Sequence, residues 1–594
     1  MAVSHMLQTI YIPPALQINS LLHVLLSIPL LIAATCLLTW LVTTVQFSRS
    51  VKKSKALECN GVGVQAIPIK PPVLPYAIPW LGHALAFLNE DPGSFWRMLQ
   101  TKLTGTGANV QFCTVLLAGQ RVHITSSASA VQALFRSRQV SRELFNQQIA
   151  LDALGCPKRD TEIMFPSTQA RDIPTTDNAA QEAKEHKSLS MDAINHEFLL
   201  NQTAANSLTN KFMAHFTASL DSAEIGSEWT TIDLLAWLKN IMFHASTAAI
   251  LGTKILEMNP NLAEQFWDYD AGFLARFYRL PKLVKPDAYA SLDKILDSTT
   301  EWVEAALADC GGNPSEEPDW EPLFGSKVMR ARQRFYEQKG FSSRGRAAFD
   351  IGFLFAVSSN VIPIMSWLLA HLVSPVHPGD DTLTRIQAEI ERAKRPDKTV
   401  DISVLLTQPL LNSAVHETMR HYIDLLVTRQ LNNDMVLDGY LLKKGDLIMA
   451  PTSLSHHDPR FWDHHQQYLK ESDKAPADSW VAERFLKHQD PDDTTGGKET
   501  FSASWAAGKF FPFGGGMHAC PGRVFAKQEI LGAVATLLAQ FEIRFVEYLR
   551  TDSKGNAVAG LGEHPAGFPR PRRQYAGNGT LSIDGDIRVQ IRRR

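Results

Sequence analysis

FFPFGGGMHACPGRVFAKQEI, residues 510–530, combines a glycine-rich turn, one cysteine and the start of an amphipathic helix. Four of its residues, Phe513, Gly516, Cys520 and Gly522, fit the pattern F-x-x-G-x-x-x-C-x-G. Four such residues at these spacings should occur by accident in roughly one chain in a thousand of this length. The stretch therefore predicts a loop that presents the Cys520 thiol at the start of a helix.

This loop resembles the haem-binding loop of the cytochrome P450 superfamily. The resemblance implies that Cys520 is the axial thiolate ligand of haem b iron and that Phe513 and Gly516 shape the cofactor-binding loop. The residue types suit that role, because glycine lets the backbone approach a flat ligand and a helix N-terminus stabilises a thiolate. The competing interpretation is a small buried cysteine next to an ordinary loop.

Two further motifs precede the loop in the order that this family requires. A proline-initiated helix beginning at residues 407–409 carries Glu417 and Arg420, which are three residues apart and share one face. A lone E-x-x-R is expected by chance, but here it is followed by the segment Ala482-Glu483-Arg484-Phe485. The resemblance implies that Glu417, Arg420 and Arg484 form a buried ion-pair network that fixes the scaffold on the haem side.

The apolar segment 347–373 permits two interpretations, a second membrane span or a helix buried in a large core. Asp350, Asn360, Pro363 and His371 within it favour the buried helix. The resemblance agrees, because the family runs a long helix across the distal face of the haem.

Most family members carry A-G-x-acid-Thr on that helix, whereas this chain has Ala356-Val357-Ser358-Ser359-Asn360. Ser359 therefore takes the place of the acid and Asn360 that of the threonine. In this respect the chain is similar to the branch that contains sterol 7α- and 12α-hydroxylases and prostacyclin synthase.

Proline at position 363 leaves the Ser359 carbonyl without its helical partner and bends the axis. We expect an opened turn at which Ser359 and Asn360, the candidate catalytic residues, bind dioxygen, water or a substrate oxygen. The alternative is that Asn360 only satisfies the freed backbone.

The propionates of the haem would need basic partners. The resemblance offers Arg429, which ends the strand 425–429, and His518, which is two residues before the cysteine where many members have arginine. A free surface histidine is the alternative for His518. The helical segment 195–216 lacks the tryptophan and arginine that many members direct at a propionate, so one partner stays unassigned.

The N-terminal region predicts a membrane anchor. After a segment 1–20, residues 21–45 contain no charge and would span roughly 37 Å as a helix, enough to cross a bilayer. A cleaved signal peptide is the alternative, but the basic residues follow the apolar run, which favours an anchor with the next domain on the cytosolic side. Residues 46–80 form a basic and proline-rich linker, and residues 81–594 form the catalytic domain.

The rest of the chain gives weaker signals. Residues 109–125 predict a β-hairpin, and residues 155–185 lie where the family keeps a mobile loop over the substrate. The tail after Phe545 is interpreted as a β-containing surface extension without chemistry. The six cysteines are far apart, which fits free thiols in a reducing compartment. A net charge of −2 does not favour electrostatic binding of nucleic acid.

Together these features predict a mainly α protein with small β-sheets, the cytochrome P450 fold, preceded by one transmembrane helix in the endoplasmic reticulum membrane. The expected activity is monooxygenation of a lipophilic terpenoid, steroid or polyketide in secondary metabolism, using O2 and electrons from NADPH through NADPH-cytochrome P450 reductase. One alternative is a reductant-independent isomerase or dehydratase of a peroxide. Another is a haem sensor or carrier without turnover.

Overall fold

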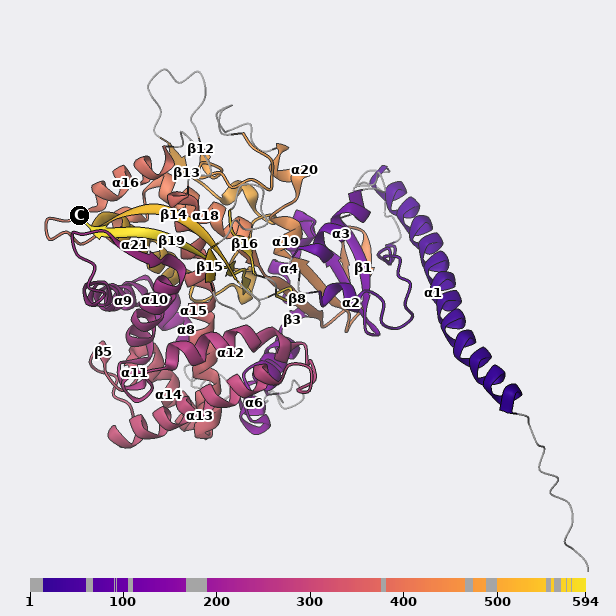
Figure 1. Cartoon of the computed structure of the whole chain (residues 1–594), viewed down its shortest axis with the longest axis horizontal. Coiled ribbons are helices and arrows are strands. Elements are labelled where there is room, and N and C mark those ends of the chain that lie inside the picture. The colour runs from indigo at the N-terminus through magenta and orange to yellow at the C-terminus, as the bar shows by residue number, and fades with distance from the viewer. Residues whose placement is uncertain are drawn as a thin grey trace, which may run out of the picture.

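The computed structural model describes residues 14–59, 68–89, 91, 93–104, 111–166, 190–374, 381–464, 474–487, 499–551, 557–559, 568–572, 574–577 and 579–594, with side chains omitted for 14–26, 55–59 and 557–559. Most of residues 1–20, residues 167–185 of the predicted mobile loop and Asn578 lie outside this part of the chain. The described part is mainly helical with small sheets, as predicted, and one long helix extends from a globular body (Figure 1).

The extended helix is α1, Pro14–Cys59. The most apolar 18 consecutive residues within Ser27–Ser54 have a mean hydropathy of 2.1, and only 6% of them are buried, which fits a membrane anchor. The helix continues past residue 45 into the predicted linker, because arginine and lysine are good helix formers.

The C-terminal part of α1 packs against the globular body. Thr43 Oγ1 lies 3.0 Å from the Tyr76 carbonyl oxygen and accepts the Tyr76 N–H at 3.2 Å. Phe47 and Val51 are buried in an apolar cluster with residues of α2 (Ala84–Phe87) and α3 (Ser94–Thr104). The anchor is therefore joined to the body by a packed interface as well as by the chain.

A five-stranded sheet adjoins this interface, in the order β1 (Phe112–Leu117), β2 (Gln120–Thr125), β11 (Leu447–Pro451), β8 (Leu426–Leu431) and β3 (Val140–Ser141). The predicted hairpin is confirmed: β1 and β2 pair antiparallel, and Ala118 and Gly119 turn the chain with φ of 48° and 84°. The sheet carries Arg429 on β8.

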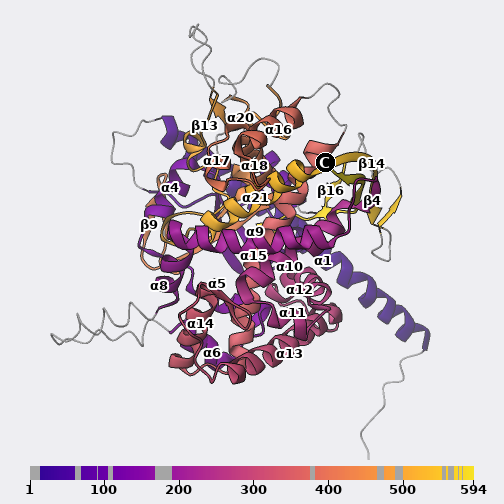
Figure 2. The same ribbon diagram turned by 90° about the vertical axis from the view of Figure 1, so that its left-hand side faces the viewer.

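The longest helices of the body pack around α15, Ser343–Val373. Figure 2 shows α9 (Gln202–Ser222) and α21 (Arg523–Gln540) crossing one side of this core. The other long helices are α10 (Leu234–Leu251), α12 (Leu262–Phe277), α13 (Pro286–Asp309), α14 (Lys327–Lys339) and α18 (Pro409–Tyr422). Although α15 is apolar and long enough to cross a membrane, 72% of its apolar stretch is buried, so it is the buried helix that we expected.

Shorter elements connect these helices. The remaining α-helices are α4 (Ala128–Arg136), α5 (Glu143–Gln148), α6 (Lys158–Met164), α8 (Met191–Asn195), α11 (Lys254–Met258), α16 (Thr382–Ala393), α17 (Ile402–Leu405), α19 (Thr452–Ser455) and α20 (Pro459–Trp462). Short π or 3₁₀ turns are η1 (Ile149–Ala153), η3 (His196–Leu200), η6 (Ser504–Ala506) and η7 (Gly516–His518). Two-stranded pairs are β5 (Trp320–Glu321) with β6 (Gly325–Ser326), β9 (Met435–Leu437) with β10 (Tyr440–Leu442), β12 (Leu486–Lys487) with β13 (Thr500–Phe501), and β16 (Arg570–Pro571) with β18 (Ile583–Asp584).

The C-terminal region corrects one expectation. Strands β14 (Phe541–Thr551) and β19 (Asp586–Arg593) form a sheet with β15 (Ala557–Ala559) and β4 (Thr230–Asp233), and β19 buries Ile587, Val589 and Ile591 in the main core. A second segment, β17 (Gly579–Thr580), pairs with β7 (Ile423–Asp424). The interpretation of this tail as a surface extension is wrong, because alternating apolar residues give β19 a buried face.

Candidate active site

The loop before α21 has the conformation that its glycines permit. Gly514 and Gly516 have φ of 66° and 67°, whereas Gly515 is extended. A Cβ at Gly516 would lie 1.9 Å from the Phe135 carbonyl oxygen of α4, so both the conformation and the space demand glycine there. The Cys520 N–H donates to the Phe513 carbonyl at 2.9 Å, which closes the loop around the residues that the motif predicts.

Cys520 is the one exposed cysteine among the residues whose side chains the structure describes. It stands just before α21, whose N-cap is Gly522. Packing around the sulfur raises the pKa of the Cys520 thiol, while the Gly522 N–H and the charges of Arg523 and Arg142 act in the opposite direction. Binding to a metal ion would remove the thiol proton outright.

Three basic side chains gather near this sulfur: Arg142, Arg429 and His518. Burial, helped by the like charge of Arg142, lowers the pKa of Arg429 to about 9. Burial and these two arginine charges also lower the pKa of His518. Within the described part of the chain neither guanidinium forms an ion pair, and Arg429 donates only to the Thr428 carbonyl at 2.9 Å. Arg429 is buried and Arg142 is half-buried, and two cations that repel each other in such surroundings favour an anion between them.

This donor set fits haem b, which has a thiolate-accepting iron and two propionate carboxylates. Cys520 would hold the iron, and the cationic group Arg142, Arg429 and His518 would hold the propionates. Arg142 would supply the propionate partner that the sequence left unassigned. It follows β3 without any motif, so only the fold places it within electrostatic reach of a cysteine 378 positions later (520 minus 142).

The predicted distal residues lie at one turn of α15. Ala356 is exposed and Asn360 half-buried on a helix that is otherwise mostly buried, so this face borders an open space. The Asn360 amide donates to the Ala356 carbonyl at 3.0 Å and accepts from Thr580 Oγ1 at 3.1 Å. The carbonyl that Pro363 leaves without a helical partner is that of Ser359. The Asn360 amide therefore does not satisfy this carbonyl, because it donates to the Ala356 carbonyl instead.

Ser359 is buried and points to another helix. Its hydroxyl donates to the Asp270 carboxylate of α12. Neither Asp270 nor Thr580 was predicted, because each comes from an element remote in sequence and carries no motif.

The comparisons with known proteins agree with this geometry. The family model for cytochrome P450 matches residues 71–561. The chain belongs to the cytochrome P450 family. It is similar to cytochrome P450 monooxygenase fsoE of Humicola fuscoatra, with 28% identity over 94% of this chain and 92% of the relative. It is 27% identical to cytochrome P450 monooxygenase calL of Penicillium decumbens, over 80% and 85% of the two chains. It is also 25% identical to cytochrome P450 7A1 of Oryctolagus cuniculus, over 84% and 91%.

The protein is thus a cytochrome P450 monooxygenase. The family implies a haem-thiolate centre, a substrate, O2 and an electron donor. These matches favour the monooxygenase prediction over a peroxide isomerase and over a carrier without turnover.

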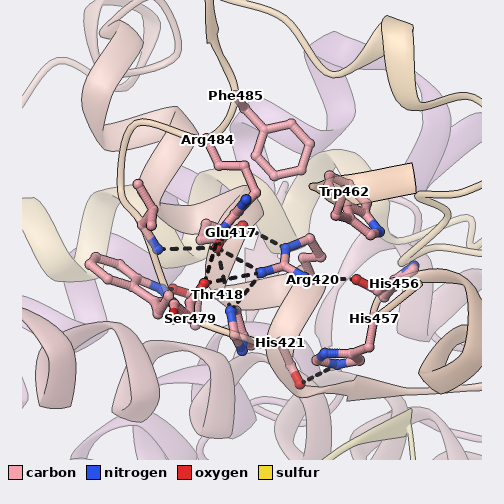
Figure 3. A network of polar contacts seen from close by, with 12 residues as sticks. Glu417, Thr418, Arg420, His421, His456, His457, Trp462, Ser479, Arg484 and Phe485 are labelled. Atoms are coloured by element: carbon pink, nitrogen blue, oxygen red, sulfur yellow. Dashed lines mark hydrogen bonds and ion pairs between the residues drawn. The ribbon is translucent and has the colours of Figure 1, made fainter. Parts of the chain in front are cut away.

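In this P450 the structure brings Glu417, Arg420 and Arg484 together as expected (Figure 3). Arg420 donates to both Glu417 carboxylate oxygens, at 2.7 and 2.9 Å, and Arg484 Nε donates to Glu417 at 2.8 Å. Although burial alone raises the pKa of the Glu417 carboxyl, the two guanidinium charges outweigh it and hold that pKa well below its usual range. Glu417 is therefore ionised, and its charge is balanced within the network.

The ion-pair network also reaches the cysteine loop of the P450 through His456. Arg420 Nη1 donates to the His456 carbonyl at 2.7 Å, and the ring Nε2 of His456 accepts the Phe511 N–H at 3.1 Å. Burial lowers the pKa of His456 to about 3, so the ring is neutral and can accept this bond. One residue thus joins the E-x-x-R helix to the start of the loop that carries Cys520.

Proposed function

We propose that this monooxygenase hydroxylates or otherwise oxidises a lipophilic small molecule of terpenoid, steroid or polyketide type in secondary metabolism. In this proposal Cys520 is the axial ligand of haem b. The observation that carries the proposal is one exposed cysteine at a helix start beside a buried and a half-buried arginine that form no ion pair with the described residues. Half-buried Phe353 and Val357 on α15, next to exposed Ala356, support an apolar substrate.

Each group of residues has a separate task. Thiolate-bound haem iron, when present, supplies the electron-rich metal that activates dioxygen. Arg142, Arg429 and His518 neutralise the cofactor carboxylates and fix its orientation. The apolar face of α15 keeps bulk water away from the substrate, and Asn360 and Ser359 position polar groups at the opened turn. The ion-pair network around Glu417 holds the loop from behind and takes no part in the chemistry.

A cysteine variant tests the cofactor assignment. Cys520→Ala should abolish the thiolate-type absorption band of the reduced carbon-monoxide complex, because no other described cysteine is presented by such a loop. The matched control is Cys310→Ala, which removes a partly exposed thiol from the end of α13 and should leave the band intact. A band that survives in Cys520→Ala would show that the ligand is another residue.

The membrane assignment proposes a single span in the endoplasmic reticulum, with the domain in the cytosol next to an NADPH-cytochrome P450 reductase. Two glycosylation sequons report on the orientation: residues 201–203 and residues 578–580. Asn201 is exposed at the N-terminus of α9, so a lumenal domain would be modified there. We expect no change in electrophoretic mobility on glycosidase treatment, and a glycan at either site would place the domain in the lumen.

Comparison of metabolites before and after deletion of the gene would identify the substrate. We expect a less oxidised lipophilic compound to accumulate in the deletion strain. Purified enzyme should then convert that compound only when NADPH and the reductase are both supplied. Product formation at full rate without a reductant would instead point to isomerisation of a peroxide.

A further inference from the structure

The reaction of the proposed function consumes protons that the distal helix alone does not supply. One substrate, one O2, two electrons from the reductase and two protons give one hydroxylated product and one water. Proton delivery requires a group that titrates, and the Asn360 amide does not. The only acid on α15 is Asp350, which accepts from Gln333 at 2.5 Å and Tyr336 at 3.2 Å on α14.

A carboxyl group reaches the opened turn from a different helix. Helix α12 contacts α15 through side chains, where Phe273 stacks on Phe355 with ring centroids 4.0 Å apart. About one turn further on, the Ser359 hydroxyl donates to the Asp270 carboxylate. We propose that Asp270 of α12, acting through Ser359, is the proton donor to the dioxygen pocket beside Asn360.

The surroundings of Asp270 suit a group that exchanges a proton. It forms no ion pair within the described part of the chain, although Lys239 of α10, Arg572 and Arg276 contribute positive charge around it. Arg276 is occupied by the carbonyls of Ala153, Ala288 and Tyr269.

Burial raises the pKa of Asp270, and the Ser359 hydrogen bond and these charges oppose that rise. The Lys239 ammonium lies over the Trp267 ring and interacts electrostatically with both Asp270 and Asp586. Through Lys239, Asp270 is therefore coupled to the start of β19. The carboxyl is therefore neither locked in an ion pair nor freely solvated.

The relay conserves atoms and charge. In the structure the Ser359 hydroxyl donates to the Asp270 carboxylate, so the relay begins when Asp270 takes up a proton and this hydrogen bond reverses. Protonated Asp270 then donates its proton to Ser359 Oγ, and the Ser359 hydroxyl proton leaves toward Asn360. One O–H bond forms and one breaks at Ser359, and Asp270 takes a replacement proton from solvent. Asn360 is held by Ala356 and Thr580, so it orients the acceptor and does not titrate.

The relay can be tested without knowing the substrate. Holoenzyme in lipid vesicles with reductase and NADPH reduces O2 either to peroxide or to water, and only the second path needs the further protons. We expect Asp270→Asn and Ser359→Ala to lower the share of electrons that ends in water about tenfold, with a matching rise in peroxide. Ser359→Thr, which keeps a hydroxyl, should restore the share.

The matched control is Ser358→Ala, because Ser358 is the adjacent buried hydroxyl and has no hydrogen-bond partner among the described residues. It should behave as the wild type does. In the wild type the share of water should fall as pH rises through the raised pKa of Asp270, and Asp270→Asn should remove that dependence. If Asp270→Asn fails to retain haem, the comparison of Ser359→Ala with Ser358→Ala tests the proposal instead. Equal peroxide yields from Ser359→Ala and Ser358→Ala would overturn the proposal.

A second readout does not depend on turnover. Infrared difference spectra between wild type and Asp270→Asn, recorded just above the ordinary pKa of an aspartate, should contain the band of a protonated carboxyl, and Ser359→Ala should shift it. A carboxylate signal alone at that pH would contradict the proposal. Loss of the thiolate band in wild type would instead refute the haem assignment, so the two failures are distinguishable.

Discussion

Two groups of arginines differ in how their charge is balanced. Around Glu417, each guanidinium meets a carboxylate oxygen within 2.9 Å, and backbone carbonyls accept further donors, although Arg484 Nη1 has no partner among the described residues. Around Cys520, Arg142 and Arg429 repel one another, and neither forms an ion pair with a carboxylate in the described part of the chain. A charge that the protein balances itself serves the scaffold, whereas a charge left unbalanced indicates a ligand that brings the opposite charge.

The largest effect should follow from breaking the balanced group. Glu417→Ala leaves two guanidiniums buried without a carboxylate to balance their charge and should cost about 3–5 kcal/mol of the free energy of unfolding. We expect little holoenzyme, measured by haem content and by urea denaturation. Glu391→Ala, which removes an exposed partner of Lys394, should cost no more than about 1 kcal/mol. Similar losses in both variants would contradict the comparison.

A buried acid without a cation provides the second test. Glu529 of α21 accepts only from Ser246 at 2.6 Å, and burial raises its pKa from 4.5 to about 8. Because the folded state binds this proton more tightly, the free energy of unfolding should be highest below pH 4.5 and fall as pH rises to about 8.

The difference in unfolding free energy across that range is at most about 5 kcal/mol. Denaturant titrations at several pH values give the unfolding free energy as a function of pH. This free energy should change less with pH in Glu529→Gln than in the exposed control Glu264→Gln. Parallel curves for the two variants would mean that Glu529 is ionised in the folded protein.

The smallest effect on folding should come from the unbalanced group. Arg142→Ala removes a half-buried charge that has no anion in the apoprotein, so the apoprotein should unfold at the same denaturant concentration or a higher one. Haem affinity should fall by about 2 kcal/mol, roughly thirtyfold, because a charge-assisted contact to a propionate is lost. Haem transfer to apomyoglobin measures this, with the exposed Arg138→Ala as control. Lower apoprotein stability with unchanged haem affinity would assign Arg142 to the scaffold.

The fold and about half of the candidate site could be predicted from local sequence patterns. The spacing of Phe513, Gly516 and Cys520 is a property of one loop, and Glu417 and Arg420 share a helix face, so both could be predicted. Arg142, Asp270 and Thr580 could not, because their side chains reach the site from β3, α12 and the C-terminal tail through tertiary packing. The end of α1 was missed for a related reason: its charged residues break the hydropathy pattern but continue the helix.

The packed contact between α1 and the body has a practical consequence for preparing this enzyme. Phe47 and Val51 share an apolar cluster with Leu74, Phe87 and Trp96, so cutting the chain after residue 54 would uncover those partners to water. The exposed residues from Ile28 to Val42 can be removed without that penalty, since nothing in the body covers them. A soluble form should therefore begin near Thr43 and keep the last turns of its anchor.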